Sequence, residues 1–217
     1  MSIADNIKKH REILGEKVEL VAVSKTKPVE ALEEAYAAGQ RIFGENKIQE
    51  MVSKWEKLPK DIEWHMIGHV QTNKIKYMAP MVAMVHGVDR EKVLKELNKQ
   101  AAKCDRVIDC LLQVHIAQEE TKFGFDPAEV DELVGRLQAY PNVRVRGLMG
   151  MATNTDEETV VEQEFASLNE LFRKFKAEKD WDVLSMGMSG DYQIAIKQGS
   201  THVRIGSAIF GARNYPI

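Results

Sequence analysis

The sequence predicts an α/β protein built as a single (β/α)8 TIM barrel with an extra N-terminal helix. Short apolar runs rich in β-branched residues alternate with amphipathic helical stretches nearly from end to end of the 217-residue chain. Strands that alternate with helices form a parallel sheet through right-handed crossovers. About eight such pairs are what closes a barrel. An open, doubly wound sheet is the alternative that the same alternation allows.

Each predicted strand is a short apolar run followed by a helical pattern. The predicted strands cover residues 18–24, 41–43, 63–67, 82–88, 106–114, 143–149, 182–186 and 201–205. The predicted helices cover residues 2–14, 28–38, 45–56, 72–78, 90–103, 156–179, 189–198 and 206–211. A further helix opens at Asp126-Pro127, where Asp is a favourable N-cap and Pro a favourable first helical residue. Without a linker, low-complexity tract or repeat, residues 1–217 are expected to form one domain.

The composition, with 44% hydrophobic and 29% charged residues, is typical of a soluble globular protein. The formal net charge is −3, and no basic block marks a nucleic-acid-binding face. No apolar stretch approaches the roughly 20 residues that span a membrane, and the N-terminal residues lack a signal-peptide pattern. The two cysteines, Cys104 and Cys110, match no zinc or redox spacing. We therefore expect a cytoplasmic protein with free thiols that binds neither nucleic acid nor membrane.

Lys25 lies at the carboxyl end of the first predicted strand, in the run Ala22-Val-Ser-Lys25-Thr-Lys-Pro28. The active sites of barrels form at the carboxyl ends of their strands. A lysine amine in that position can form a Schiff base with a carbonyl compound, once burial or nearby positive charge lowers its pKa. Lys25 is therefore a candidate for binding a carbonyl cofactor or substrate.

The loops after the seventh and eighth predicted strands contain glycine and serine, and each leads into a helix. The first loop is Ser185-Met-Gly-Met-Ser189-Gly190-Asp191 and the second is Arg204-Ile-Gly206-Ser207. Barrels often bind phosphate at this place, through backbone N–H groups and hydroxyls. Strand eight pairs with strand one in a closed barrel, so Lys25 and these loops are expected to share a pocket. Pyridoxal 5′-phosphate, with its aldehyde and phosphate, fits such a pocket, and so does a sugar phosphate held by a Schiff-base aldolase.

Several segments resemble the pyridoxal phosphate homeostasis protein family, also called the proline synthase co-transcribed family. Besides the Lys25 run and the two loops, they are Phe43-Gly-Glu-Asn46-Lys-Ile-Gln-Glu50, His65-Met-Ile-Gly-His-Val-Gln-Thr-Asn-Lys74, Lys122-Phe-Gly-Phe125 and Gly147-Leu-Met-Gly-Met-Ala152. They run in family order across almost the whole chain. Val70 and Gly150 depart from the commoner family residues without affecting the expected cofactor site.

The resemblance implies a barrel similar to the N-terminal domain of alanine racemase, with pyridoxal 5′-phosphate as its cofactor. It implies that Lys25 carries the cofactor as an internal aldimine and that Arg204 faces the pyridine nitrogen. The residues that it assigns to the phosphate are Ser189, Gly190, Gly206 and Ser207, and those that it assigns to the pocket around the ring are Asn46, His65 and Met149. No metal site is expected, because His65 and His69 straddle a strand end without an apparent third ligand.

The family is implicated in intracellular pyridoxal phosphate (vitamin B6) and amino-acid homeostasis, without an established catalytic turnover. Arg204 cannot accept a proton, so it would leave the pyridine nitrogen unprotonated and the ring a weak electron sink. Because the chain ends at Ile217, we expect it to lack the racemase domain that supplies a tyrosine base, and to be a monomer. The predicted role is a carrier or regulator that serves pyridoxal phosphate-dependent apo-enzymes. The alternative is a weak amino-acid racemase or another pyridoxal phosphate-dependent enzyme acting on small amino acids.

Overall fold

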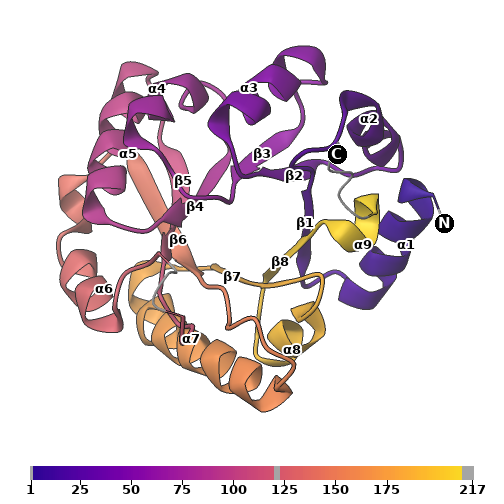
Figure 1. Ribbon diagram of the computed structural model, residues 1–217. Helices are drawn as coiled ribbons and strands as arrows, with labels where there is room; N and C mark the ends of the chain where they lie inside the picture. Colours follow the sequence, from indigo (N-terminus) through magenta and orange to yellow (C-terminus); the bar gives the residue numbers. More distant parts are fainter. Residues whose placement is uncertain (1, 120–122, 212–217) are drawn as a thin grey trace.

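Among the described residues, eight parallel strands pair in chain order, and β1 also pairs with β8 to close a barrel (Figure 1). The computed structural model describes residues 2–119 and 123–211. The strands are β1 (Glu19–Val23), β2 (Ile42–Glu45), β3 (Glu63–Met66), β4 (Met84–Val88), β5 (Ile108–Gln113), β6 (Val143–Met149), β7 (Val183–Met188) and β8 (His202–Ile205). The predicted (β/α)8 barrel is therefore confirmed, and the open sheet is excluded.

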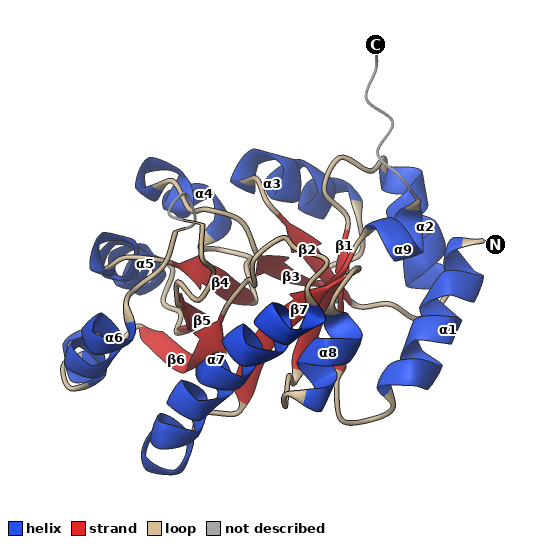
Figure 2. Cartoon of the chain, turned by 60° about the horizontal axis from the view of Figure 1, so that its bottom comes forward, coloured by secondary structure: helices blue, strands red, loops and turns tan. Residues whose placement is uncertain are grey.

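Helices surround the barrel on the outside (Figure 2). They are α1 (Ile3–Leu14), α2 (Val29–Ala37), α3 (Ile48–Lys57), α4 (Ile75–Met78), α5 (Glu91–Lys103), α6 (Pro127–Val134), α7 (Glu158–Lys179), α8 (Tyr192–Lys197) and α9 (Ser207–Phe210), with short 3-10 turns η1 (Thr72–Lys74) and η2 (Leu137–Ala139). The extra helix α1 precedes the first strand, as predicted, and contacts α2 and α9. Asp126 takes the N-cap position of α6, and Pro127 opens that helix.

Alternate side chains of each strand face the helices or the barrel interior, because a strand has a side-chain period of two. Ala22, Phe43 and Trp64 belong to the large apolar core between the strands and the helices. Smaller buried clusters, formed by residues of the opposite parity, fill the interior: Val21, Val23 and Ile67 make one, and Met84, Leu111, Met149 and Val183 make another. The interior also contains buried polar side chains, namely His65, His86, Ser185 and Arg204. It is therefore a packed core with a polar region within it.

Two predicted helix starts lie three residues before the first helical residue that the structure shows. Helix α3 begins at Ile48 rather than at residue 45, because Glu45 ends β2 and its side chain is buried against Lys54. Helix α8 begins at Tyr192, so Ser189 and Gly190 lie in the loop before it. Within the described part of the chain, no helix combines the length and apolar character needed to cross a bilayer.

Candidate functional site

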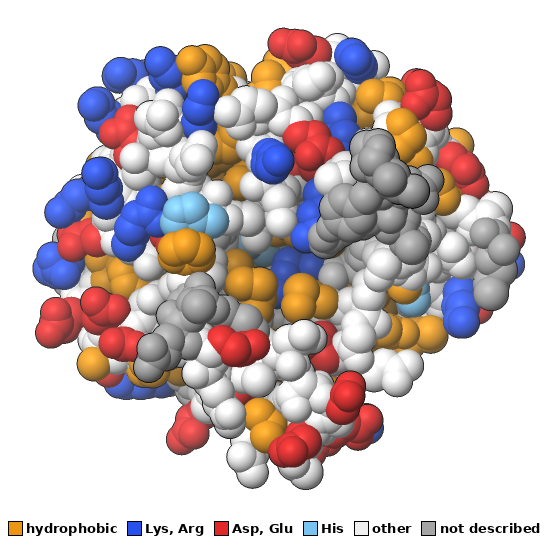
Figure 3. Space-filling model, viewed as in Figure 1, with side chains coloured by type: hydrophobic (Ala, Val, Ile, Leu, Met, Phe, Trp, Pro, Cys, Tyr) orange, Lys and Arg blue, Asp and Glu red, His pale blue; other side chains and the backbone are white. Residues whose placement is uncertain are grey.

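A cavity of about 400 Å³ lies at the carboxyl ends of the strands. Figure 3 shows a hollow near the middle of this face, where Lys and Arg side chains meet hydrophobic ones. Its lining includes every residue that the sequence assigned to the cofactor except His65 and Met149: Lys25, Asn46, Ser189, Gly190, Arg204, Gly206 and Ser207. The fold thus brings the lysine, the arginine and both loops into one pocket.

Lys25 is half-buried in the turn that follows β1. The next residue, Thr26, has a φ of 63°, a conformation that β-branched residues rarely adopt. The backbone N–H of Thr26 donates to Glu50 Oε1 at 2.6 Å. A carboxylate from α3 therefore holds the turn that presents Lys25 to the cavity.

A buried ion-pair network lies beneath this turn. Lys54 Nζ is 2.7 Å from both Glu45 Oε1 and Glu50 Oε1, and it donates to the Ser24 carbonyl at 2.8 Å. The Ser24 hydroxyl donates to Glu45 Oε1 at 2.6 Å. Burial raises the pKa of Glu45, and the Lys54 charge opposes that rise. The network ties α3 to the ends of β1 and β2, on either side of the Lys25 turn.

Asn46 follows β2 and reaches the cavity through a close approach of two backbone segments. A Cβ added to Gly68 would lie 2.6 Å from the Asn46 carbonyl oxygen, so only glycine fits there without displacement. Gly68 also lines the cavity. The glycine in the His65–Lys74 segment therefore lets the loop after β3 pack directly on the loop after β2.

The loops after β7 and β8 form another part of the cavity wall and are joined to each other. The Gly206 N–H donates to Ser189 Oγ at 3.2 Å. A Cβ added to Gly190 would meet no atom within 4 Å, so the backbone there is open to a ligand. The helices that follow have only six and four residues, so their dipoles are small. The anion-binding capacity of this wall therefore rests on hydroxyls and loop N–H groups.

Arg204 extends from β8 into the cavity and is 4% exposed. Its Nη1 donates to the Ser185 carbonyl at 2.9 Å and to Ser185 Oγ at 2.6 Å, and its Nη2 donates to the Gly150 carbonyl at 3.0 Å. Burial lowers the pKa of Arg204 to about 10, so the guanidinium is still charged at neutral pH. The cavity therefore contains a fixed cation that can donate hydrogen bonds but cannot accept them.

The structure does not bring His65 or Met149 to the cavity. His65 lies in the barrel interior, with its Nδ1 2.9 Å from His86 Nε2. Met149 is fully buried against Met84, Leu111 and Val183. Ile67 and Met151, two residues further along the chain in each case, line the cavity instead.

A second group of lining residues was not assigned to the pocket by the sequence, and it includes His69, Gln113 and Phe123. His69 Nδ1 is 2.6 Å from the buried Asp89 Oδ2, and its ring lies 4.1 Å from that of Phe123. Gln113 Nε2 donates to the Phe123 carbonyl at 2.8 Å. Lys122, which belongs to the same family-like segment as Phe123, lies outside the described residues. The available signal for His69 and Gln113 was position, because both lie at or shortly after the carboxyl end of a strand, whereas Phe123 was marked only by its place in a family-like segment.

The two histidines with helical spacing separate in the fold. His65 is inside the barrel, whereas His69 pairs with Asp89 at the cavity rim. Within residues 2–119 and 123–211, no group of three or more His, Cys, Asp or Glu residues is placed to hold a metal ion.

Comparison with known proteins places the chain in a family. The sequence profile of the alanine racemase N-terminal domain matches residues 1–214. The pyridoxal phosphate homeostasis protein of Vibrio alginolyticus is 46% identical over 206 residues, which cover 92% of this chain and 88% of that protein. PipY of Synechococcus elongatus PCC7942 is 33% identical, and its structures without and with pyridoxal phosphate superpose with TM-scores of 0.92 and 0.89, each covering 97% of this chain and 100% of PipY.

More distant structures match in fold alone. An alanine racemase of Clostridium difficile superposes with a TM-score of 0.82 at 13% identity, and the match covers 99% of this chain and 57% of the racemase. The similarity of the barrel to the N-terminal part of alanine racemase is thus confirmed. The profile match over residues 1–214 and curated relatives that are 42–46% identical show that this chain belongs to the alanine racemase N-terminal domain family, among the pyridoxal phosphate homeostasis proteins.

Proposed function

We propose that this protein binds pyridoxal 5′-phosphate as an internal aldimine at Lys25 and acts in the cytoplasm as a carrier or regulator of the cofactor. Its role would lie in vitamin B6 and amino-acid homeostasis, with pyridoxal phosphate-dependent apo-enzymes as recipients. The observation that carries the proposal is one cavity that joins the Lys25 amine, the buried Arg204 cation and the hydroxyl-bearing loops after β7 and β8. The names of the curated relatives and the cofactor-bound PipY structure support it.

The residues present fit the two reactive ends of the cofactor. Lys25 offers a primary amine for the aldehyde, with Arg204 supplying positive charge in the same cavity. Positive charge near an amine favours its neutral, nucleophilic form. The open backbone at Gly190 and the hydroxyls of Ser189 and Ser207 offer donors to the phosphate. When bound, the cofactor would supply an electrophilic ring system, while the chain's own residues bind and orient it.

Arg204 favours holding the cofactor over catalysing reactions with it. A carboxylate opposite the pyridine nitrogen would keep that nitrogen protonated and make the ring a strong electron sink. The buried guanidinium of Arg204 remains charged at neutral pH and can only donate. The site is therefore suited to reversible attachment at Lys25 more than to stabilising a carbanion.

We further propose that residues 1–217 form one cofactor-binding barrel that works as a monomer. The described lining of the cavity comes from the strand ends of the closed barrel and from the segments that follow them. Light scattering of the purified protein is expected to give the mass of one chain, and twice that mass would contradict this part of the proposal.

The experiment that tests the proposal is borohydride reduction of the protein after loading with pyridoxal phosphate. We expect the absorbance of a Schiff base to be lost on reduction, and mass spectrometry to place the stable adduct on Lys25. Lys25→Ala should form no such adduct. Lys27→Ala is the matched control, because Lys27 lines the same cavity and should leave the adduct on Lys25. A reducible adduct of normal yield in Lys25→Ala would refute the assignment.

A weak racemase or another pyridoxal phosphate-dependent enzyme on small amino acids is the second candidate. One observation favours it, which is the His69 imidazole in the cavity wall, held by the buried Asp89 carboxylate. A histidine oriented by a carboxylate is a common general acid or base. It would supply the proton-transfer group that the tyrosine provides in alanine racemase.

A further inference from the structure

A chain of buried hydrogen bonds runs from Arg204 through the interior of the barrel. Arg204 Nη1 donates to Ser185 Oγ at 2.6 Å, Ser185 Oγ lies 3.0 Å from His86 Nδ1, and His86 Nε2 lies 2.9 Å from His65 Nδ1. These residues come from β8, β7, β4 and β3, so the chain crosses the barrel rather than following one strand. All four side chains are at least nine-tenths buried.

The chemistry of Arg204 fixes the direction of every bond in this chain. A guanidinium has only donors, so Ser185 Oγ accepts from it. The other contact of Ser185 Oγ among the described residues is His86 Nδ1, which must then accept the hydroxyl proton. The reverse arrangement would leave a buried hydroxyl without an acceptor, which is unfavourable. His86 therefore carries its proton on Nε2 and donates it to His65 Nδ1, so that His65 carries its own proton on Nε2.

The two histidines of this hydrogen-bond chain, His65 and His86, are neutral at physiological pH. Burial lowers the pKa of His65 to about 3 and places that of His86 well below its ordinary value. Arg204 is therefore the only charged member of the four. A neutral imidazole is also what the direction of the bonds requires, because a charged one would have no lone pair for Ser185 or His86.

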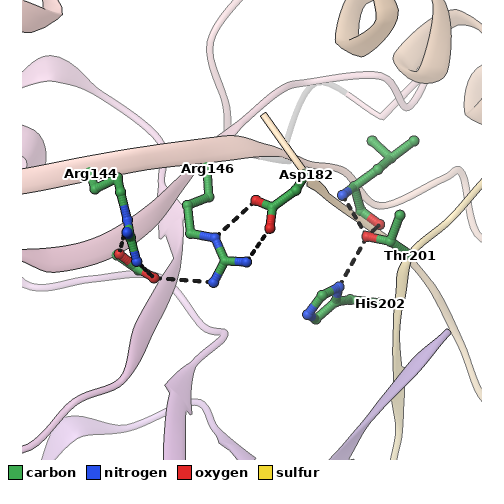
Figure 4. A network of polar contacts seen from close by, with 7 residues as sticks. Arg144, Arg146, Asp182, Thr201 and His202 are labelled. Atoms are coloured by element: carbon green, nitrogen blue, oxygen red, sulfur yellow. Dashed lines mark hydrogen bonds and ion pairs between the residues drawn. The ribbon is translucent and has the colours of Figure 1, made fainter. Parts of the chain in front are cut away.

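The hydrogen-bond chain ends at His65, which reaches a second cavity at the amino ends of the strands. His65 lines this cavity together with His202, Arg146 and Asp182. Figure 4 shows its polar wall, where Arg146 faces Asp182 and Thr201 bonds to His202. Water in this cavity can accept the proton of His65 Nε2, so the chain can end without a buried, unpaired donor.

We propose that Ser185 and His86 are positioning residues for Arg204, holding its guanidinium in one orientation through a directional hydrogen-bond chain. Ser185 fixes Nη1 through both its carbonyl and its hydroxyl, and His86 fixes the hydroxyl. These contacts use both N–H groups of Nη1 and one of Nη2, so the other Nη2 N–H and that of Nε would remain available to a bound cofactor. The role of this orientation in cofactor binding rests on the proposed function, whereas the direction of the hydrogen bonds does not.

The direction can be tested on the ligand-free protein by long-range ¹H–¹⁵N correlation spectra of the histidine rings. We expect His86 and His65 to be neutral, each with Nε2 protonated and Nδ1 unprotonated. In Ser185→Ala, His86 should lose this single tautomer and show exchange between the two forms. A His86 ring protonated on Nδ1 in the wild-type protein would overturn the inference, even if pyridoxal phosphate binds.

The positioning role is tested by the release rate of pyridoxal phosphate from variants. Ser185→Ala and His86→Leu should release it roughly tenfold faster, because a hydrogen bond to a charged group is lost or weakened. His86→Asn, which keeps an acceptor for Ser185, should recover part of the difference. Ser200→Ala is the matched control, because Ser200 is a buried serine of the same region that bonds only to backbone carbonyls.

The two outcomes separate the inference from the proposed function. A wild-type protein that binds no pyridoxal phosphate would refute the proposed function while leaving the tautomer result intact. Release rates for Ser185→Ala and His86→Leu equal to that of Ser200→Ala would refute the positioning role alone.

Discussion

His69 is the residue on which the two candidate functions differ. Its Nδ1 is held at 2.6 Å by Asp89, so its other ring nitrogen is available to the cavity. If this imidazole transfers a proton at the α-carbon of an amino acid, the pyridoxal phosphate-loaded protein should exchange that proton of L-alanine in deuterated water. Removing a general acid or base typically costs 100-fold or more, so His69→Gln should slow exchange by about that factor.

The measurement is the loss of the α-proton signal by NMR, with Asp89→Asn as a second variant that loosens the ring without removing it. Under the carrier proposal, exchange by the wild-type protein is slow on the scale of minutes to hours. Rapid exchange would count against the carrier, and equal rates in wild type and His69→Gln would rule out His69 as the proton-transfer group.

Residue types at strand ends were predictable, but their depth in the barrel was not. Lys25, Ser189 and Arg204 carry chemistry that marks them individually, and they lie in the cavity. For His65 and Met149 the expected pocket position is instead occupied by Ile67 and Met151. Residues two apart on a strand face the same side, so the sequence period indicates the interior face. It does not tell how many layers lie between a residue and the barrel mouth.

At the scale of elements, Lys54 connects α3 to the strands that support Lys25. It is 5% exposed and contacts two carboxylates. Lys54→Met would leave Glu45 buried without its cation and would remove one of the two donors to the Ser24 carbonyl, the other being the Lys27 N–H. Breaking such a pair usually costs about 3–5 kcal/mol, and we expect a loss of unfolding free energy of that order in urea titrations.

Lys57→Met is the control on the same helix, because Lys57 is exposed and its loss should change stability by less than about 0.5 kcal/mol. The double variant Glu45→Gln, Lys54→Met should recover part of the loss, since it also removes the uncompensated charge. A Lys54→Met protein as stable as Lys57→Met would show that the network does not hold these elements together.

The start of α3 illustrates what local patterns miss. The helical pattern extends back to Glu45, but that residue ends β2 because its carboxylate bonds to Ser24 and Lys54. Two contacts, with residues nine and 21 positions away from Glu45, decide where the strand ends and the helix begins. Such contacts depend on the assembled fold, so the sequence predicted the element but placed its start three residues too early.

For the whole molecule, the count of eight strand–helix pairs predicted a closed barrel, whereas their alternation alone also allowed an open sheet. An open sheet uses the same βα units, and only the pairing of β1 with β8 distinguishes the two. Closure creates an interior that is shielded on all sides. Polar side chains placed there, such as His65 and His86, are therefore buried to a degree that no local pattern indicates.

This buried interior makes the stability of the whole barrel sensitive to acid. Burial lowers the pKa of His65 to about 3 and that of His202 to about 4, whereas an unfolded histidine has a pKa near 6.5. Below pH 6.5 the unfolded chain therefore binds more protons than the folded one. The stabilisation is fully present above pH 6.5 and is lost progressively as the pH falls toward 4 and then 3, by up to about 1.4 kcal/mol per pH unit for each histidine.

Urea unfolding at pH 7, 6 and 5 should therefore give a falling free energy of unfolding, with a smaller slope in His65→Gln than in the wild-type protein. The buried Glu45 acts in the opposite sense because its pKa is raised, but it is present in both proteins and cancels in the comparison. Asp182, whose pKa is lowered, loses its contribution only at more acidic pH. Equal slopes for the two proteins would mean that His65 is already protonated in the folded barrel, or is not buried there at all.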